Sequence, residues 1–171
     1  DEQTRLGSFF DSIHRRYIPI EEVPIHLINA FIASEDKNYY SHIGVDPIAV
    51  SLAFADGIVR GGFHRGASTI TQQTVKNILD RREHSFRRKF REWVRALQLE
   101  RLYDKKQIME FYLNQFHVAH NGNGVGIAAR YYFDKDVRDL TLAEAAFIAG
   151  SVKAPSKYNP FIKDTPERKE K

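Results

Sequence analysis

The sequence contains no cysteine, one methionine and one tryptophan among its 171 residues. The absence of cysteine excludes disulfide bonds and metal sites built on cysteine. No stretch approaches the roughly 20 apolar residues that a membrane-spanning helix requires. Charge of either sign is not dominant, because 26 basic residues face 22 acidic ones and the formal net charge is +4. This small excess permits an anionic partner but does not require one.

The composition is that of an ordinary globular protein. Hydrophobic residues make up 42% of the chain and charged residues 28%, so long disordered stretches are not expected. The length is enough for one domain with a sizeable core. No internal repeat or linker divides the sequence. We therefore expect a single domain over residues 1–171, with a lead-in over 1–20 and a charged tail over 163–171.

Helix-start signals and apolar spacing predict a mainly α-helical fold. We expect helices to begin at or just after Pro24, Asp46, Ser68, Ser85, Asp104 and Thr141. The last two are reinforced by Gln107 and Glu144, which complete capping boxes. The longest predicted helix follows Ser85, and its predicted apolar face consists of Phe86, Phe90, Trp93, Val94 and Leu97. A glycine-rich loop is expected over residues 121–126.

Three polar clusters could carry chemistry. In the first, Glu35 and Asp36 end an apolar helix, where partial desolvation can prepare a carboxylate to act as a general base. A solvated helix end is the alternative. In the second, Gly66 to Gln73 brings small and hydroxylated residues to a helix start, where backbone amides can bind an anion. A capped, merely polar helix start explains the same pattern.

The third cluster combines cations with a carboxylate on one helix. Arg88 and Glu92 are four residues apart and share a face, with Lys89 beside them. Lys76 on the preceding helix could join them. Such an arrangement suits a pyrophosphate, although a solvated basic face with internal ion pairs is the alternative.

Three weaker signals favour structural roles. His117 and His120 have the spacing of two metal ligands, but no third ligand is evident. The glycines at 122, 124 and 126 lack the preceding strand of a dinucleotide site. The aromatic cluster over residues 131–133 is interpreted as core and not as a platform for stacking nucleic-acid bases.

Taken in order and spacing, these segments resemble the peptidoglycan glycosyltransferases, family 51 of the glycosyltransferases. The first family motif, Glu-Asp-x-x-aromatic-x-x-His-x-Gly, is filled by Glu35, Asp36, Tyr39, His42 and Gly44. The second is matched from Gly66 to Gln73, and the third by Arg88, Lys89 and Glu92. The fourth resembles residues 108–114, ending at Asn114, and the fifth resembles residues 142–146 and 154–160. The resemblance covers about residues 18–161 and is greatest to the bifunctional class A penicillin-binding proteins, whereas residues 115–124 depart from the pattern.

The resemblance implies a lysozyme-like, two-lobed fold and an enzyme that polymerises lipid II into β-1,4-linked glycan with inversion and release of undecaprenyl pyrophosphate. It implies Glu35 as the base and Glu92 as a second catalytic residue that supports the leaving group. The substrate-binding residues that it implies are Asp36, His42, Ser68, Thr69, Gln72, Gln73, Lys76, Arg88, Lys89 and Asn114. No metal cage is evident, although a divalent cation such as Mg²⁺ or Mn²⁺ would suit a departing pyrophosphate.

The resemblance also implies a location and partners. The domain would act on the outer face of the bacterial cytoplasmic membrane, with the small lobe near residues 45–65 dipping into the bilayer. Its partners would be lipid II, the growing lipid-linked glycan and other cell-wall synthesis proteins, and not nucleic acid. The alternatives are a lysozyme-like lytic transglycosylase, which would not need the basic cluster, and a non-enzymatic basic module, which would not need Glu35 and Asp36.

Overall fold

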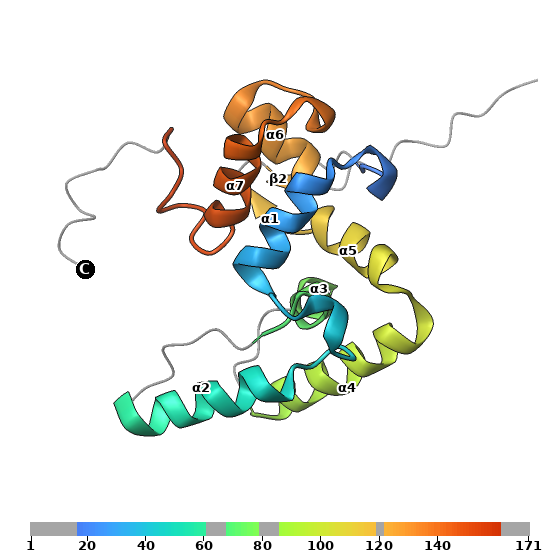
Figure 1. Cartoon of the computed structure of the whole chain (residues 1–171), viewed down its shortest axis with the longest axis vertical. Coiled ribbons are helices and arrows are strands. Elements are labelled where there is room, and N and C mark those ends of the chain that lie inside the picture. The colour runs from blue at the N-terminus through green and yellow to red at the C-terminus, as the bar shows by residue number, and fades with distance from the viewer. Residues whose placement is uncertain (1–16, 61–67, 79–85, 119–121, 162–171) are drawn as a thin grey trace, which may run out of the picture.

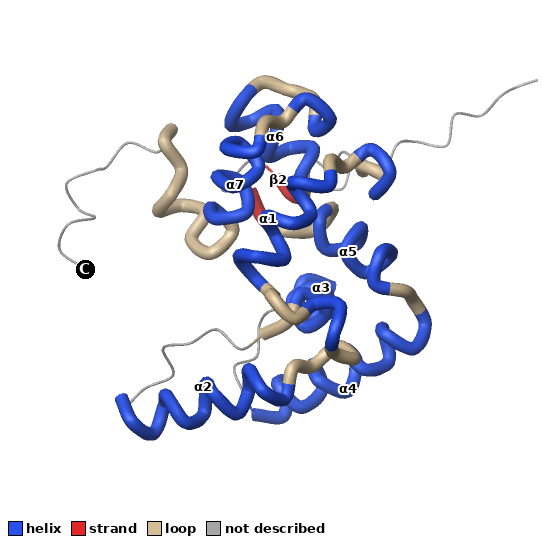
Figure 2. Tube along the Cα trace, in the orientation of Figure 1, coloured by secondary structure: helices blue, strands red, loops and turns tan. Residues whose placement is uncertain are grey.

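The computed structural model describes residues 17–60, 68–78, 86–118 and 122–161. Within these residues it contains seven α-helices, three short 3-10 helices and one two-stranded sheet (Figure 2). The α-helices are α1 (Ile25–Glu35), α2 (Pro47–Arg60), α3 (Ile70–Ile78), α4 (Phe86–Leu102), α5 (Lys105–Leu113), α6 (Val125–Phe133) and α7 (Leu142–Ser151). The 3-10 helices are Ile20–Glu22, Tyr39–Ser41 and Val137–Asp139, and the strands are β1 (His117–Val118) and β2 (Gly122–Asn123). The predicted mainly α-helical fold is confirmed.

The helices form two groups (Figure 1). Helices α1, α5, α6 and α7 make the upper group, α2 and α4 make the lower group, and α3 lies between them. Helix α1 packs against α7, while α3 contacts both α4 and α5. The arrangement agrees with the predicted two-lobed, lysozyme-like fold. None of the helices in the described ranges is long and apolar enough to cross a membrane.

The hydrophobic core lies mainly in the upper group. Leu27 and Phe31 of α1, Tyr112 of α5 and Ile148 of α7 are all fully buried. Phe31 and Tyr112 meet edge to face, with ring centroids 5.7 Å apart. Burying side chains of this size contributes about 1.5–3 kcal/mol each. The core therefore fixes α1, whose last residue is Glu35, against α5 and α7.

The aromatic cluster over residues 131–133 belongs to this core, as predicted. Tyr132 is buried and meets Phe147 of α7 edge to face, with ring centroids 5.1 Å apart. Tyr131 and Phe133 are partly buried beside it. The cluster therefore holds α6 on α7.

Local capping explains most of the helix starts. Asp46 accepts the backbone N–H groups of Ile48 and Ala49, each at 2.9 Å, and so caps α2. The capping boxes of Asp104 with Gln107 and of Thr141 with Glu144 are both present. These predictions are confirmed. Ser85, the predicted cap of α4, lies outside the described residues, as do residues 1–16 of the lead-in and the tail from 162.

The predicted cap of α3 is wrong by one residue. Thr69, and not Ser68, caps this helix: its hydroxyl accepts the backbone N–H of Gln72 at 3.1 Å, and the Gln72 side chain accepts the backbone N–H of Thr69 at 3.0 Å. This reciprocal pair is a capping box. The Thr69 hydroxyl is held in place because it also donates to the carbonyl of Gly44 at 2.6 Å.

The predicted apolar face of α4 is partly wrong. Trp93 and Leu97 are half-buried, and the side chain of Phe86 lies outside what the structure describes. Phe90 and Val94, however, are 66% and 38% exposed, whereas Glu92 and Ala96 are buried. The buried face of α4 is the one that meets α3, and at Glu92 it carries an ion-paired side chain. A charged residue that forms an ion pair in the fold can therefore be buried at a position that the apolar spacing alone predicts to be exposed.

The predicted glycine-rich loop overlaps the second strand of a hairpin that the sequence did not predict. Strands β1 and β2 pair antiparallel, with His117 opposite Asn123. Gly124 follows at φ +90°, and a Cβ at this position would lie 2.9 Å from the carbonyl oxygen of Asn114. Both the backbone angle and the close approach require glycine. The glycine thus serves the turn between the hairpin and α6.

Candidate active site

A cavity of about 750 Å³ lies where the end of α1 meets the lower helices. Its lining comes from the end of α1 and the turn after it, the start of α2, α3 and the residues just before it, the middle of α4 and the turn after α7. The charged lining residues are Glu35, Asp36, Lys37, Asp46, Lys76, Glu92 and Lys153. Its other polar lining residues are Ser34, Asn38, Ser68, Thr69 and Gln73. Carboxylates and lysines from distant parts of the chain therefore share one hollow.

Glu35 is the last residue of α1, and both of its carboxylate oxygens are hydrogen-bonded. Gln73 Nε2 of α3 donates to Oε2 at 3.0 Å, and Ser34 Oγ donates to Oε1 at 3.2 Å. No cation is paired with Glu35 among the described residues. The carboxylate is thus oriented by neutral donors and keeps its capacity to accept a proton.

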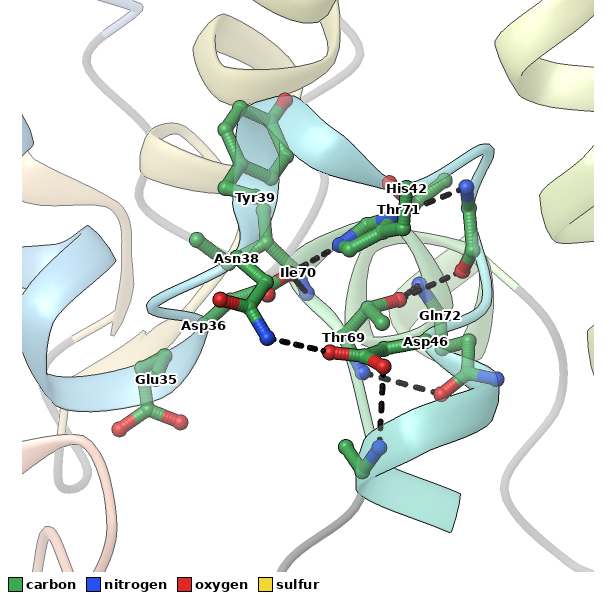
Figure 3. Close-up of polar contacts among 12 residues, drawn as sticks. Glu35, Asp36, Asn38, Tyr39, His42, Asp46, Thr69, Ile70, Thr71 and Gln72 are labelled. Carbon is green, nitrogen blue, oxygen red and sulfur yellow. Dashed lines mark hydrogen bonds and ion pairs between the residues drawn. The ribbon is translucent and has the colours of Figure 1, made fainter. Parts of the chain in front are cut away.

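Asp36 has a different environment from its neighbour. His42 Nε2 and the backbone N–H of Ile70 both lie 2.9 Å from Asp36 Oδ2. The backbone N–H of Gly44 donates to His42 Nδ1 at 3.0 Å, so Nε2 carries the proton that is donated to Asp36. In Figure 3 the Glu35 carboxylate points away from this network. Asp36 thereby ties the end of α1 to the start of α3.

Some residues of the second motif line the cavity, and others stabilise the start of α3. Ser68, Thr69 and Gln73 line the cavity, and Lys76 lies one turn further along α3 and also lines it. Gln72 is fully buried and caps α3, as described above. Of the two adjacent glutamines, Gln73 thus reaches Glu35 and Gln72 holds the helix start.

The third motif forms a hydrogen-bonded group at the wall of the cavity. Lys89 Nζ lies 2.5 Å from Glu92 Oε1 and 3.1 Å from Ser68 Oγ. Glu92 is only 3% exposed, so Lys89 neutralises a buried carboxylate. Lys76 is exposed and has no ion-pair partner within the described ranges. The side chain of Arg88 lies outside what the structure describes, so its place in the predicted clamp stays a prediction.

Asn114 does not line the cavity, and its side chain binds the backbone of Ile18, near the start of the described residues. Its side chain accepts the backbone N–H of Ile18 at 2.8 Å and donates to the carbonyl of Ile18 at 2.9 Å. Glu110, one turn earlier, accepts from the Tyr17 hydroxyl and from the backbone N–H of Ile20. The bond from Glu110 raises the pKa of Tyr17 to about 12. Like His42 and Gln72, Asn114 is buried in the fold, and its predicted contact with substrate stays a prediction.

Ser34, Lys37, Asp46 and Lys153 line the cavity but were missed as site residues. Ser34 and Lys37 adjoin the Glu35-Asp36 pair, and Lys153 adjoins the segment 154–160 of the fifth motif. Adjacency to a motif was thus the available signal for these three. Asp46 was recognised as a cap, and only the fold places it beside the cavity.

Burial and hydrogen bonding shift the pKa values of two groups near the site. The backbone N–H of Ala49, followed by the side chain of Asn38, lowers the pKa of Asp46. Desolvation raises the pKa of Tyr112, and the nearby charges of Glu35 and Asp36 raise it further. Tyr112 is therefore a neutral phenol beneath the site. Within the described ranges, no group of three or more histidine, aspartate or glutamate side chains could hold a metal ion.

The two-lobed helical fold thus places carboxylates and lysines in one hollow, where they can supply a proton acceptor and positive charge to a bound ligand. Comparison with known proteins identifies the family of this chain. Residues 2–171 match the family described as Transglycosylase. The chain is 45% identical over 168 residues to penicillin-binding protein 1A of Aquifex aeolicus (strain VF5), covering 98% of this chain and 23% of that protein. It is 48% identical over 164 residues to penicillin-binding protein 1A of Neisseria lactamica, covering 96% of this chain and 20% of that protein.

The chain therefore belongs to the transglycosylase family, as a peptidoglycan glycosyltransferase domain homologous to those of penicillin-binding proteins 1A. The family and enzyme class that the motifs predicted are confirmed. The chain spans less than a quarter of the length of either relative.

Proposed function

We propose that this domain lengthens glycan strands by joining lipid II to a growing lipid-linked chain, at the outer face of the bacterial cytoplasmic membrane. The observation that carries the proposal is the position of Glu35. This carboxylate lines a cavity that Lys76 of α3 and Glu92 of α4 also line, and Glu92 is paired with Lys89. A proton acceptor and cationic side chains thus lie in or beside one hollow.

The proposed reaction is a single displacement at the anomeric carbon of the donor sugar. The 4-hydroxyl oxygen of the acceptor forms a bond to that carbon and gives its proton to Glu35. The bond from the carbon to the pyrophosphate oxygen breaks, and the pyrophosphate leaves with the electron pair. Attack from the face opposite the leaving group converts the α-linkage of the donor into the β-1,4-linkage of the product. Glu35 is suited to this step because its donors orient both carboxylate oxygens.

The leaving pyrophosphate needs positive charge beside it, because negative charge develops on its oxygens as the bond breaks. Lys76 and Arg88 are proposed to contact it directly. Lys89 is proposed to contact it while bound to Glu92 and Ser68. Glu92 then has the supporting role of fixing Lys89, and Lys153 adds a further cation from the upper group. The described residues do not offer a metal cage, so no step is assigned to a divalent cation.

The lower group of helices is proposed to lie against the bilayer that contains the substrate. Ile48 and Leu52 of α2 are 66% and 51% exposed, and because they are four residues apart they lie next to each other on one face of the helix. Other cell-wall synthesis proteins are proposed as further partners of the full-length enzyme.

The direct test is to incubate the purified domain with lipid-linked disaccharide in detergent and separate the products by size. Polymer is the expected product. A second incubation with preformed glycan distinguishes the lytic alternative, which would give fragments of that glycan. Absence of polymer under conditions in which the domain is folded would overturn the proposal.

A further inference from the structure

Glu35 occupies an electrostatically unfavourable place for a carboxylate. It is the last residue of α1, and Asp36 follows as the C-cap. The C-terminal end of a helix carries partial negative charge from its unpaired carbonyl groups. A carboxylate at that end is repelled by the helix and by the charge of Asp36. Its orientation toward the cavity therefore depends on donors that hold it there.

Two donors do this, and they reach different oxygens. Gln73 of α3 donates to Oε2 at 3.0 Å, whereas Ser34, the residue before Glu35 on α1, donates to Oε1 at 3.2 Å. Gln73 is a recognised part of the second motif. Ser34 belongs to no motif, yet it lines the same cavity.

The hydroxyl of Ser34 has an alternative that other helical hydroxyls take. Serine and threonine inside helices commonly donate to a backbone carbonyl one turn earlier. Ser51 donates to the carbonyl of Pro47 at 2.8 Å, and Thr74 donates to that of Ile70 at 2.9 Å. Ser34 instead donates to the carboxylate of Glu35. Its hydrogen bond therefore serves the site and not its own helix.

We propose that Ser34 is a positioning residue for the general base: its hydroxyl fixes Oε1 of Glu35 while Gln73 fixes Oε2, so that the carboxylate faces the attacking hydroxyl in one orientation. The inference rests on the proposed role of Glu35. A charge-assisted bond of this kind commonly contributes enough to change a rate by about tenfold. Ser34 is not required to touch the substrate, so its removal acts on turnover and not on binding.

The test compares Ser34→Ala, which loses the donor, with Ser34→Thr, which keeps it. Ser151→Ala is the matched control, because it deletes a helical hydroxyl that donates to the carbonyl of Ile148 at 2.8 Å and does not contact Glu35. With lipid-linked disaccharide as substrate, Ser34→Ala should lower kcat by about tenfold with KM within about twofold of the parent. Ser34→Thr and Ser151→Ala should keep kcat near the parent value.

Crystal structures of the parent and the three variants give a readout that does not need activity. The Glu35 side chain should adopt one orientation in the parent, Ser34→Thr and Ser151→Ala, and should leave it or divide between two in Ser34→Ala. The same Glu35 orientation in all four proteins, a raised KM, or no rescue by threonine would each overturn the inference. If the parent makes no polymer, the proposed function fails, and the crystallographic comparison still decides whether Ser34 positions Glu35.

Discussion

Gln73 and Glu35 join two helices that are far apart in the sequence: Gln73 Nε2 on α3 lies 3.0 Å from Glu35 Oε2 at the end of α1. The donor is a neutral amide. A lysine in its place would form an ion pair with the carboxylate and make it a weaker proton acceptor. The amide orients the oxygen without adding positive charge. Among the described residues no lysine is paired with Glu35, although Lys76 lies one turn further along α3 and lines the same cavity.

Glu35→Gln should remove nearly all polymerisation and leave the fold intact. The change preserves the shape of the side chain and removes its ability to accept a proton. Loss of a general base typically lowers a rate by about 10²–10⁴-fold. Polymer formation from lipid-linked disaccharide and the melting temperature should be measured together. Glu21→Gln is a suitable control, because Glu21 is an exposed carboxylate paired with Lys106. Turnover of Glu35→Gln within about tenfold of the parent would reject Glu35 as the base.

Glu92→Gln should also reduce polymerisation, because it leaves Lys89 without its carboxylate partner. The measurement must separate binding from turnover. If Glu92 supports the leaving group, kcat should fall while inhibitor affinity changes little. A change in affinity with an unchanged rate for bound substrate would make Glu92 a binding residue instead.

Phosphoglycolipid inhibitors of the moenomycin type should bind the domain, because they imitate a lipid chain that carries a phosphate. Lys76→Ala should weaken this binding by about 1.5–3 kcal/mol, the usual contribution of one charge-assisted hydrogen bond. Arg88→Ala should weaken it similarly. Lys106→Ala removes an exposed lysine that is paired with Glu21 and should have no effect. Calorimetric titrations would measure all four proteins, and failure of the parent to bind would contradict the proposed anion site.

Asp46 should make the stability of the domain depend on pH. The hydrogen bond from Ala49, followed by that from Asn38, lowers the pKa of Asp46 in the folded state. Its stabilising contribution is thus present above the ordinary value of 3.8 and is lost as the pH falls through the lower folded value. Asp46→Ala should lower the free energy of unfolding at pH 7 by about 0.5–2 kcal/mol. Urea denaturation should show this difference shrinking below about pH 4, and a difference that is constant with pH would refute the explanation.

Features set by neighbouring residues were predicted well from the sequence. The capping boxes at Asp104 and Thr141 need contacts over three residues only, and both are present. The choice between Ser68 and Thr69 as the cap of α3 could not be made locally. It depends on the carbonyl of Gly44, which is 25 residues away in the sequence and binds the Thr69 hydroxyl.

The candidate site shows the same limit. Motif matching predicted Glu35, Gln73 and Glu92, the charge pattern added Lys76, and the fold brings all four to one cavity. The same matching gave Asn114 a substrate contact, which stays a prediction, and the structure shows its side chain paired with the backbone of Ile18, 96 residues away. A motif marks a residue whose environment is constrained. Whether the constraint comes from substrate or from a distant backbone segment is decided by the three-dimensional contacts.

Helix α2 covers most of the segment near residues 45–65 that is predicted to dip into the bilayer. Ile48 and Leu52 are exposed on this helix, whereas the side chains of Phe54 and Ile58 lie outside what the structure describes. Exposed apolar residues in a lipid-processing domain favour insertion at the membrane surface. We therefore expect the domain to sediment with vesicles of anionic lipid, less strongly in high salt.

Ile48→Asp and Leu52→Asp should reduce this sedimentation while the fold survives, because both side chains already face solvent. Leu142→Asp is the matched control: Leu142 is 68% exposed, but it lies at the start of α7 in the upper group. Circular dichroism and melting temperature would establish that each variant folds. If the α2 variants unfold, the side chains belong to the core. If the α2 variants fold and bind vesicles as the parent does, the membrane contact lies on another surface. The same conclusion follows if Leu142→Asp reduces binding equally, because insertion through α2 requires that a substitution in the upper group leave vesicle binding unchanged.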